Sequence, residues 1–394
     1  MRRIAGSNLA VLLAAIFLIA SAEELWARFI PAYLRALGAS VAVVAAYGTF
    51  KDFLDAIYQF PGGLIANRAG YRRALVGFNA VAIIGYSAFA FAQSWTALFF
   101  ALPLVMAWQS FSLPATFSLI GDSLPSGARS VAFAWQSIVR RVPVVLAPIA
   151  GGLILTHYGT LSGTRIAIVA DIAIALFALV LQSVSYKDAP LAATRLRLAE
   201  LIRDAPKLGP RLRRLLLSDI IVRFGQGVGE IFVVLYALSV VGVTPAVFGW
   251  LVGLAMATSI VVYLPVSRYA DAHRREPWVL LTYVFFAAFP LLLAVSKTPW
   301  FLAIAFVAMG LREIGEPPRK AMIVDLARTD RRSVDVGAYY LVRGLAVFPA
   351  SLVGGALWQI QPALTFYAAA AIAACGAFTF AALMMRRIGN TSGL

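Results

Sequence analysis

The sequence predicts an all-α membrane protein with twelve transmembrane helices in two six-helix halves, and three observations lead to that class. The first is composition: of 394 residues, 61% are hydrophobic and 13% are charged, whereas soluble domains are about 45–50% apolar and about 25% charged. The second is that the apolar residues gather into runs of roughly 20, the length at which a helix crosses a bilayer. The third is an internal repeat.

The repeat relates residues 114–152 to residues 317–355, which align without a gap at one offset. Asp325 lies 203 residues after Asp122, and Gly355 lies 203 residues after Gly152. In each copy an acidic residue ends an apolar run, a basic loop follows, and an arginine stands inside the next apolar run. The period is far longer than that of a solenoid repeat. We therefore interpret the two copies as halves of one fold.

Each half contains six apolar runs. The predicted helices are 8–34, 41–66, 74–92, 96–121, 131–156 and 164–186 in the first half, and 215–241, 245–267, 277–295, 300–324, 334–358 and 362–385 in the second. The halves, 1–186 and 215–394, flank a polar linker, 187–214. Leu198, Leu201 and Ile202 share one helical face in this linker, which is typical of an amphipathic helix on the membrane surface. A solvated tether is the alternative.

The basic residues predict the orientation. They gather at both termini, in the linker and in every second connection, and the formal net charge is +16. The connection between the tenth and eleventh helices carries Arg319, Lys320, Arg328, Arg331 and Arg332. Loops rich in Lys and Arg stay in the cytoplasm, so both termini are predicted to lie inside. We expect an integral protein of the cytoplasmic (inner) membrane of a prokaryote, in contact with the lipid bilayer.

Several functional classes are disfavoured. The one cysteine, Cys375, cannot form an internal disulfide. The two histidines, His157 and His273, lie at opposite predicted faces of the membrane, so they cannot bind one metal ion together. The chain has no phosphate-binding loop of the P-loop type. We therefore expect that the protein is not an enzyme, and that it binds no cofactor, no metal ion and no nucleic acid.

Ionisable residues within the apolar runs are the candidate functional groups, because a charge at bilayer depth costs about 2.5–3.5 kcal/mol or more. Together with nearby polar and aromatic residues at the same depth, the candidates for proton coupling or substrate binding are Glu23, Glu24, Arg28, Asp52, Asp55, Trp108, Gln109, Glu230, Arg312, Glu313, Glu316 and Tyr339. Trp26 and Tyr58 are further aromatic residues that we expect to line a substrate site.

Spacing predicts how some of these charges interact. Residues four apart share a helix face, so ion pairs are expected between Glu24 and Arg28, Asp219 and Arg223, and Arg312 and Glu316. Glu23 or Glu24 is alternatively a proton or cation site.

Other spacings indicate proton binding and helix breaks. Asp52 and Asp55, three apart, place two acids together, which suits a proton carrier; neutralisation by Lys51 or by an arginine of another helix is the alternative. Three glycines beside Glu230 favour an unwound helix, and Pro317 and Pro318 predict a break in the tenth helix. Asp171 in the sixth helix is expected to be structural.

Two motifs resemble a known family. Residues 63–73, G-L-I-A-N-R-A-G-Y-R-R, are similar to the signature G-x-L-A-D-R-x-G-R-R of the major facilitator superfamily, with Asn67 in place of its aspartate. Residues 147–152, A-P-I-A-G-G, resemble the G-P-x-x-G-G of its drug–proton antiporters. The resemblance implies a monomeric transporter whose first, fourth, seventh and tenth helices line a cavity.

The resemblance also implies a charged cytoplasmic gate, to which we assign Gly63, Asn67, Arg68, Gly70, Arg72, Arg73, Asp122, Arg129, Arg140, Asp271, Asp325, Arg332 and Arg343. Within it, Arg140, Arg141 and Arg343 are expected to pair with Asp122, Asp325 or Asp335.

The predicted function is secondary transport of a small molecule by alternating access, with proton-coupled export of a lipophilic or cationic compound. Uptake or facilitated transport of a small anionic metabolite, held by Arg140 and Arg343, is the alternative. A non-transporting receptor or scaffold is a more distant one.

Overall fold

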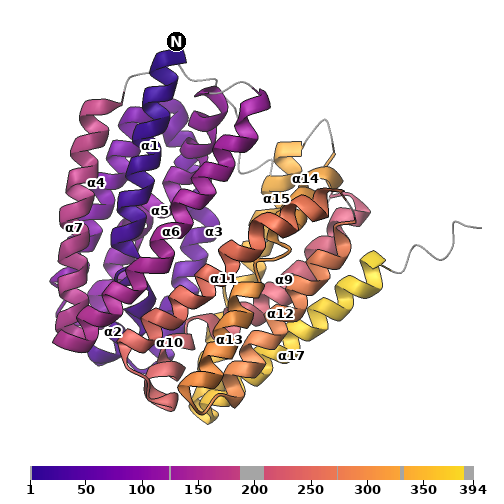
Figure 1. Ribbon diagram of the computed structural model, residues 1–394. Coiled ribbons are helices and arrows are strands. Elements are labelled where there is room, and N and C mark those ends of the chain that lie inside the picture. The colour runs from indigo at the N-terminus through magenta and orange to yellow at the C-terminus, as the bar shows by residue number, and fades with distance from the viewer. Residues whose placement is uncertain (1, 124–125, 187–207, 273, 329–331, 386–394) are drawn as a thin grey trace, which may run out of the picture. The chain divides into compact units, whose positions relative to one another are not determined.

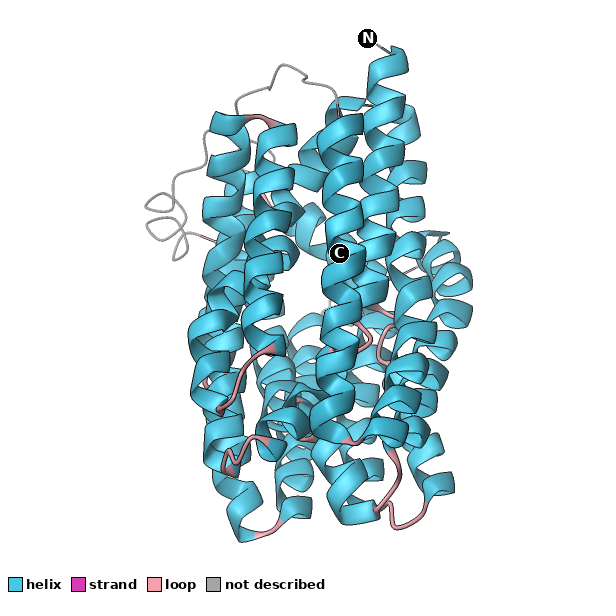
Figure 2. Cartoon of the chain, turned by 90° about the vertical axis from the view of Figure 1, so that its left-hand side faces the viewer, coloured by secondary structure: helices cyan, strands magenta, loops and turns pink. Residues whose placement is uncertain are grey.

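The computed structural model describes residues 2–123, 126–186, 208–272, 274–328 and 332–385. Side chains are described for these residues except 2–9, 59–64, 66–69, 71, 113–123, 126–141, 263–264, 267–272 and 332–333. Within this part of the chain the regular structure is entirely helical (Figures 1 and 2). The predicted amphipathic segment of the linker lies outside the described residues.

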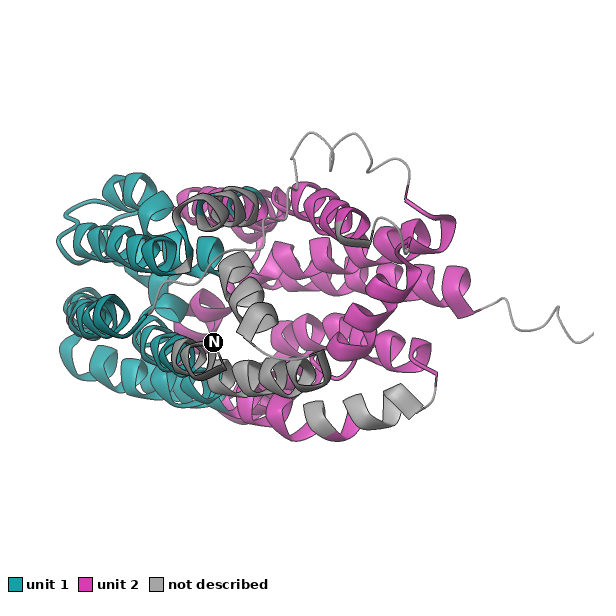
Figure 3. Ribbon diagram, turned by 90° about the horizontal axis from the view of Figure 1, so that it is seen from above, with its two compact units in different colours: residues 1–39, 57–195, 244–253 teal, residues 40–56, 196–243, 254–394 magenta. Residues whose placement is uncertain are grey.

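The chain forms two compact units (Figure 3). Unit 1 comprises Met1–Ala39, Ile57–Arg195 and Thr244–Gly253, and unit 2 comprises Ser40–Ala56, Leu196–Val243 and Leu254–Leu394. Helices α3 (Val41–Ala69) and α11 (Pro245–Ala272) contribute residues to both units.

Unit 1 consists mainly of long apolar helices. Its other helices are α1 (Arg2–Glu23), η1 (Ala27–Phe29), α2 (Ile30–Ala36), α4 (Tyr71–Ala90), α5 (Trp95–Ser123), α6 (Ser126–Tyr158) and α7 (Thr160–Ser185). Helix α4 packs along α5 and α7, and α1 packs along α6 and α7 (Figure 1).

Unit 2 contains shorter helices because several of its spans are interrupted. These helices are α9 (Pro210–Glu230), α10 (Val233–Leu235), η3 (Tyr236–Val241), α12 (Glu276–Val295), α13 (Pro299–Leu311), α14 (Glu316–Leu326), α15 (Arg332–Val347), α16 (Ala350–Ile360), α17 (Pro362–Phe380) and η5 (Ala381–Met385). Helix α17 lies along α9 and α12, and α16 also packs on α9.

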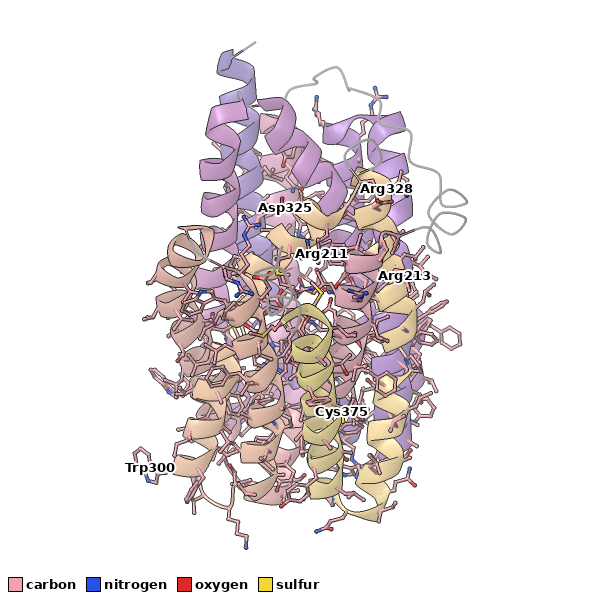
Figure 4. All side chains as sticks on the ribbon, turned by 90° about the vertical axis from the view of Figure 1, so that its right-hand side faces the viewer. Arg211, Arg213, Trp300, Asp325, Arg328 and Cys375 are labelled. Carbon is pink, nitrogen blue, oxygen red and sulfur yellow. The ribbon has the colours of Figure 1, made fainter. Side chains whose placement is uncertain are left out.

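Eight helices of the described chain are long and apolar enough to cross a membrane, and the bent pair formed by Pro210–Glu230 and Val233–Val241 makes a ninth. The count of twelve stays a prediction. Helix α3 carries Lys51, Asp52 and Asp55 in its middle, and the predicted tenth helix is divided into α13 and α14. Apolar side chains also face outward: Trp300 at the start of α13 is 83% exposed (Figure 4), as expected for a surface that meets lipid.

The first span of each half breaks directly after a glutamate. Helix α1 ends at Glu23 and α9 ends at Glu230. Two further breaks occur in unit 2, at residues 312–315 between α13 and α14 and at residues 348–349 between α15 and α16. A break leaves backbone N–H and C=O groups without their helical partners, and charged side chains lie at three of these breaks: Glu23, Glu230 and Arg312.

The internal repeat extends to tertiary contacts. In unit 1 the hydroxyl of Tyr33 donates to the carbonyl of Phe89 at 3.0 Å, and in unit 2 the hydroxyl of Tyr236, 203 residues later, donates to the carbonyl of Ala294 at 2.9 Å. Both tyrosines are buried. Each half thus closes the end of its first span by the same kind of bond.

We expect Gly354→Ala to destabilise the protein by about 1–3 kcal/mol, the usual range for overpacking. A Cβ at Gly354 on α16 would lie 1.9 Å from the carbonyl oxygen of Val228 on α9. The measurement is the unfolding midpoint of the purified protein in detergent. Gly77→Ala on α4 is the matched control, because a Cβ there meets nothing within 4 Å. Equal midpoints for the two variants would contradict close packing at Gly354.

Candidate functional site

A buried network of charged side chains lies within unit 2, centred on Asp219 of α9. Asp219 is 0% exposed. Its carboxylate accepts hydrogen bonds from Arg319 and Tyr339 at 2.8 Å, and from Tyr283 and Arg343 at 3.3 Å. These four donors come from α14, α15 and α12, so one buried acid joins four helices.

Glu316, in the first turn of α14, is the second acid of the network. It accepts from Nη2 of Arg319 at 2.7 Å, from Nε of Arg319 at 3.2 Å, and from Arg223 of α9. Arg223 also lies 3.7 Å from Asp219. The planar arginine fork can bond two carboxylates at fixed angles, and here Arg319 uses it to bridge Asp219 and Glu316.

Gln226 extends the network along α9 to Glu230. Its side-chain oxygen accepts from Arg223 at 2.9 Å, and its side-chain nitrogen donates to Glu230 at 3.3 Å. Glu230 in turn accepts from Arg312 at 3.2 Å. A continuous chain of hydrogen bonds therefore runs from Asp219 to Glu230, eleven residues or roughly 16 Å along the helix.

The pair of Glu230 and Arg312 joins two helix breaks, since Glu230 ends α9 and Arg312 directly follows α13. The side chain of Glu230 is 37% exposed and that of Arg312 only 8%. The guanidinium of Arg312 lies over the rings of Phe286 and Phe289, at 5.1 and 4.8 Å. Cation–π contacts of this kind stabilise a desolvated arginine.

Other acids surround the same break. Asp52 on the part of α3 within unit 2 is half-buried and interacts electrostatically with Glu230. A Cβ at Gly48 would lie 2.7 Å from Cδ1 of Ile231, so α3 lies directly against the break. Asp55 and Glu313 are also half-buried. The region around Glu230 is therefore rich in acids, whereas the region around Asp219 is rich in arginines.

In unit 1 the predicted pair of Glu24 and Arg28 is confirmed, with 2.9 Å between Nε and Oε2. Glu23 is half-buried, Trp108 is buried, and Gln109 is exposed. Trp26 was expected to line a substrate site, but it is 2% exposed and its indole N–H donates to Asp171 at 2.7 Å.

Comparison with known proteins identifies the family. Residues 11–240 and 215–393 match the model described as Major Facilitator Superfamily. The chain belongs to the Major Facilitator Superfamily. It is accordingly a transporter and an integral membrane protein.

A curated relative is an uncharacterised transporter of the major facilitator type from Methanocaldococcus jannaschii, 46% identical over 48 residues. The match spans 12% of this chain and 12% of that protein.

Solved structures of transporters share the fold over nearly the whole chain. A nucleoside transporter, NupG, aligns with a TM-score of 0.77 at 13% identity, covering 96% of this chain and 100% of that one. A peptide transporter, POT, aligns with a TM-score of 0.75 at 15% identity, covering 97% of each. The human organic anion transporter MFSD10 aligns at 0.65 and 14% identity, covering 95% and 99%.

The superfamily's signature loop is described in part. Gly70 has a φ of +86° and starts α4, a backbone angle that glycine adopts without strain. Arg72 donates to the carbonyl of Ser183 at 2.7 Å, and Arg73 is exposed. Asp325 pairs with Arg275. The remaining predicted gate side chains lie outside the described residues: Gly63, Asn67, Arg68, Asp122, Arg129, Arg140, Asp271 and Arg332.

Two expected pairings are wrong. Arg312 does not pair with Glu316, because residues 312–315 are not helical and the i, i+4 geometry is lost; each residue pairs with α9 instead. Arg343 does not pair with Asp325 or Asp335 but contacts Asp219.

Arg319 was counted among the basic residues of the connection after the tenth helix, although it falls within the predicted helix 300–324. It is a 2% exposed residue of α14 and not part of a basic loop. The buried acids Asp219 and Glu316 hold it there.

Asp219, Gln226, Arg319 and Tyr283 are site residues that the sequence analysis did not assign. A signal was present for two of them. Asp219, Arg223, Gln226 and Glu230 follow the spacing i, i+4, i+7, i+11, which is one face of a single helix. A polar stripe of that length within a membrane span predicts a shared network more strongly than any of its pairs does.

We expect Arg319→Met to cost about 3–5 kcal/mol of stability, because it leaves two buried carboxylates without a shared cation. Arg275→Met is the control, since its partner Asp325 is 61% exposed and exposed pairs contribute about 0–1 kcal/mol. Chemical unfolding in detergent measures both. A loss at Arg319 no larger than at Arg275 would contradict the central position of this residue.

Proposed function

We propose that this transporter is a proton-coupled secondary transporter that works by alternating access, and that Glu230 is a proton-carrying group. The observation that carries the proposal is the ion pair of Glu230 and Arg312, which joins two helix breaks while Glu230 remains 37% exposed. Discontinuous membrane helices are a common place for ion and substrate sites in secondary transporters.

The physical argument is that only one member of the pair can change its charge. Arginine stays protonated in proteins, whereas a carboxylate can accept a proton. When Glu230 is ionised, its attraction to Arg312 holds the end of α9 against the break between α13 and α14. When Glu230 is protonated, the buried charge of Arg312 loses its counter-charge, which is costly. Proton binding therefore changes the packing energy of two broken helices.

The surrounding acids support export of a lipophilic or cationic compound. Asp52, Asp55 and Glu313 lie half-buried near Glu230 and Arg312. A substrate cation and a proton would compete for the same carboxylates. Competition of this kind gives exchange, in which protons entering along their gradient displace the cation outward. A monomer with cytoplasmic termini is part of this proposal.

A second candidate is transport of a small anion. The network around Asp219 contains three arginines and two acids. Arg343 lies 3.3 Å from Asp219, and its side chain is 23% exposed, more than that of the other two arginines. One structural relative is described as an organic anion transporter, and the peptide transporter was solved in complex with sulfate. In this case the substrate's negative group would bind Arg343.

The test uses proteoliposomes loaded with a pH-sensitive dye, under an inward proton gradient, with lipophilic cations and organic anions added one at a time. We expect proton movement with a cation in the parent protein and none in Glu230→Gln. Glu276→Gln is the matched control, because Glu276 lies in the first turn of α12 beside Arg274, ten residues before Phe286, whose ring lies under Arg312. Unchanged coupling in Glu230→Gln would overturn the role of Glu230, and coupling with anions alone would favour the second candidate.

Cation binding should weaken as pH falls. If the substrate binds only when Glu230 is ionised, the apparent dissociation constant of the substrate rises about tenfold for each pH unit below the pH at which Glu230 is half protonated. The substitution Glu230→Gln removes this pH dependence together with most of the affinity. Equilibrium binding of a labelled lipophilic cation between pH 5 and pH 8 measures it. Affinity that is constant over this range would argue against competition between proton and substrate.

A further inference from the structure

Unit 1 contains a buried carboxyl group that has no part in cation export or in anion transport as proposed above. Asp171 on α7 is 0% exposed. Its Oδ2 accepts a hydrogen bond from Nε1 of Trp26 at 2.7 Å. Its Oδ1 is buried and accepts no hydrogen bond from any described residue. No lysine, arginine or histidine of the described chain pairs with it.

Among the described residues, a second acid and a tyrosine face Asp171. Glu23, the last residue of α1, and Tyr86 of α4 both interact with it electrostatically. Tyr86 is fully buried, and its hydroxyl is also without a hydrogen-bond partner in the described chain. The ring of Trp26 packs edge-on against Tyr86 and Phe89, with centroids 5.7 and 5.8 Å away, so the indole is fixed in place.

This arrangement does not suit two ionised carboxylates. A buried carboxylate without a cation or several hydrogen bonds carries a large desolvation cost, and a nearby acid of the same charge adds repulsion. One indole N–H offsets little of that cost. A carboxyl group that holds a proton removes the charge and adds an O–H donor at the oxygen that lacks a partner.

We propose that Asp171 is a proton-binding group, which holds a proton on Oδ1 in this conformation beside the second acid, Glu23. Trp26 fixes the opposite oxygen through its N–H. Glu23 is half-buried at the break of α1, so it is the group through which the proton exchanges with water. The site belongs to unit 1 and is independent of Glu230, and it holds whether or not transport is coupled to protons.

The test is infrared spectroscopy of the full chain in lipid nanodiscs at neutral pH, in H₂O and D₂O. A protonated carboxylic acid has a C=O stretch that is distinct from the carboxylate bands and shifts in D₂O. We expect Asp171→Asn, which keeps a carbonyl oxygen for Trp26 and an N–H donor in place of the O–H, to remove one such band. Asp325→Asn is the control, because that exposed acid is paired with Arg275 and its substitution should leave the band unchanged.

Two further variants test the site if Asp171→Asn does not fold. Trp26→Phe should keep the band but move it to higher wavenumber, because the hydrogen bond to the carbonyl oxygen is lost. Glu23→Gln should keep the band and slow its exchange in D₂O at least tenfold. Loss of a carboxylate band in Asp171→Asn, with the carboxylic-acid band intact, would overturn the proposal, as would a band that neither Trp26→Phe nor Glu23→Gln affects.

Discussion

The buried carboxylate of Asp219 is the constraint on which unit 2 depends. An isolated charge at that position would be very costly, and the cost is met only when arginines and tyrosines from three other helices approach α9 closely. The apolar core that surrounds these groups, which includes Leu215, Tyr283 and Phe380, keeps water away and strengthens each bond. The order of the helices around α9 is therefore determined by charge as well as by apolar packing.

The two units treat the acid at their first helix break differently. The arginine partner of Glu230 lies over the rings of Phe286 and Phe289, whereas Glu23 lies beside another acid and a tyrosine. The halves share a repeat and the same tyrosine–carbonyl bond, so this difference is local. The repeat therefore covers the tyrosine–carbonyl bond at the end of the first span, and the polar residues at the two breaks account for the different surroundings of Glu23 and Glu230.

The helical class and the family followed from composition and from the loop at residues 63–73, because these features depend on local sequence alone. The i, i+4 pair of Glu24 and Arg28 was predictable for the same reason. The contacts of Arg312 with Glu230, and of Arg319 and Arg343 with Asp219, could not be predicted in this way, because each partner lies on another helix. The break at residues 312–315 also removes the helix face that Arg312 and Glu316 were expected to share. Buried networks in membrane proteins depend on such long-range contacts, and spacing alone does not reveal them.

The backbone contact at Gly354 has a mechanical consequence. Where a glycine places one helix directly on a neighbour's carbonyl, as α16 does on α9, the two helices interlock and resist sliding. The breaks at residues 231–232, 312–315 and 348–349 interrupt the regular α-helix, and single hydrogen bonds such as that from Phe348 N–H to the carbonyl of Gly344, at 3.0 Å, remain there. Unit 2 is therefore held together by direct backbone contacts both between regular helices, at Gly354, and at a break, at Gly315, where a Cβ would lie 2.2 Å from the carbonyl oxygen of Trp278.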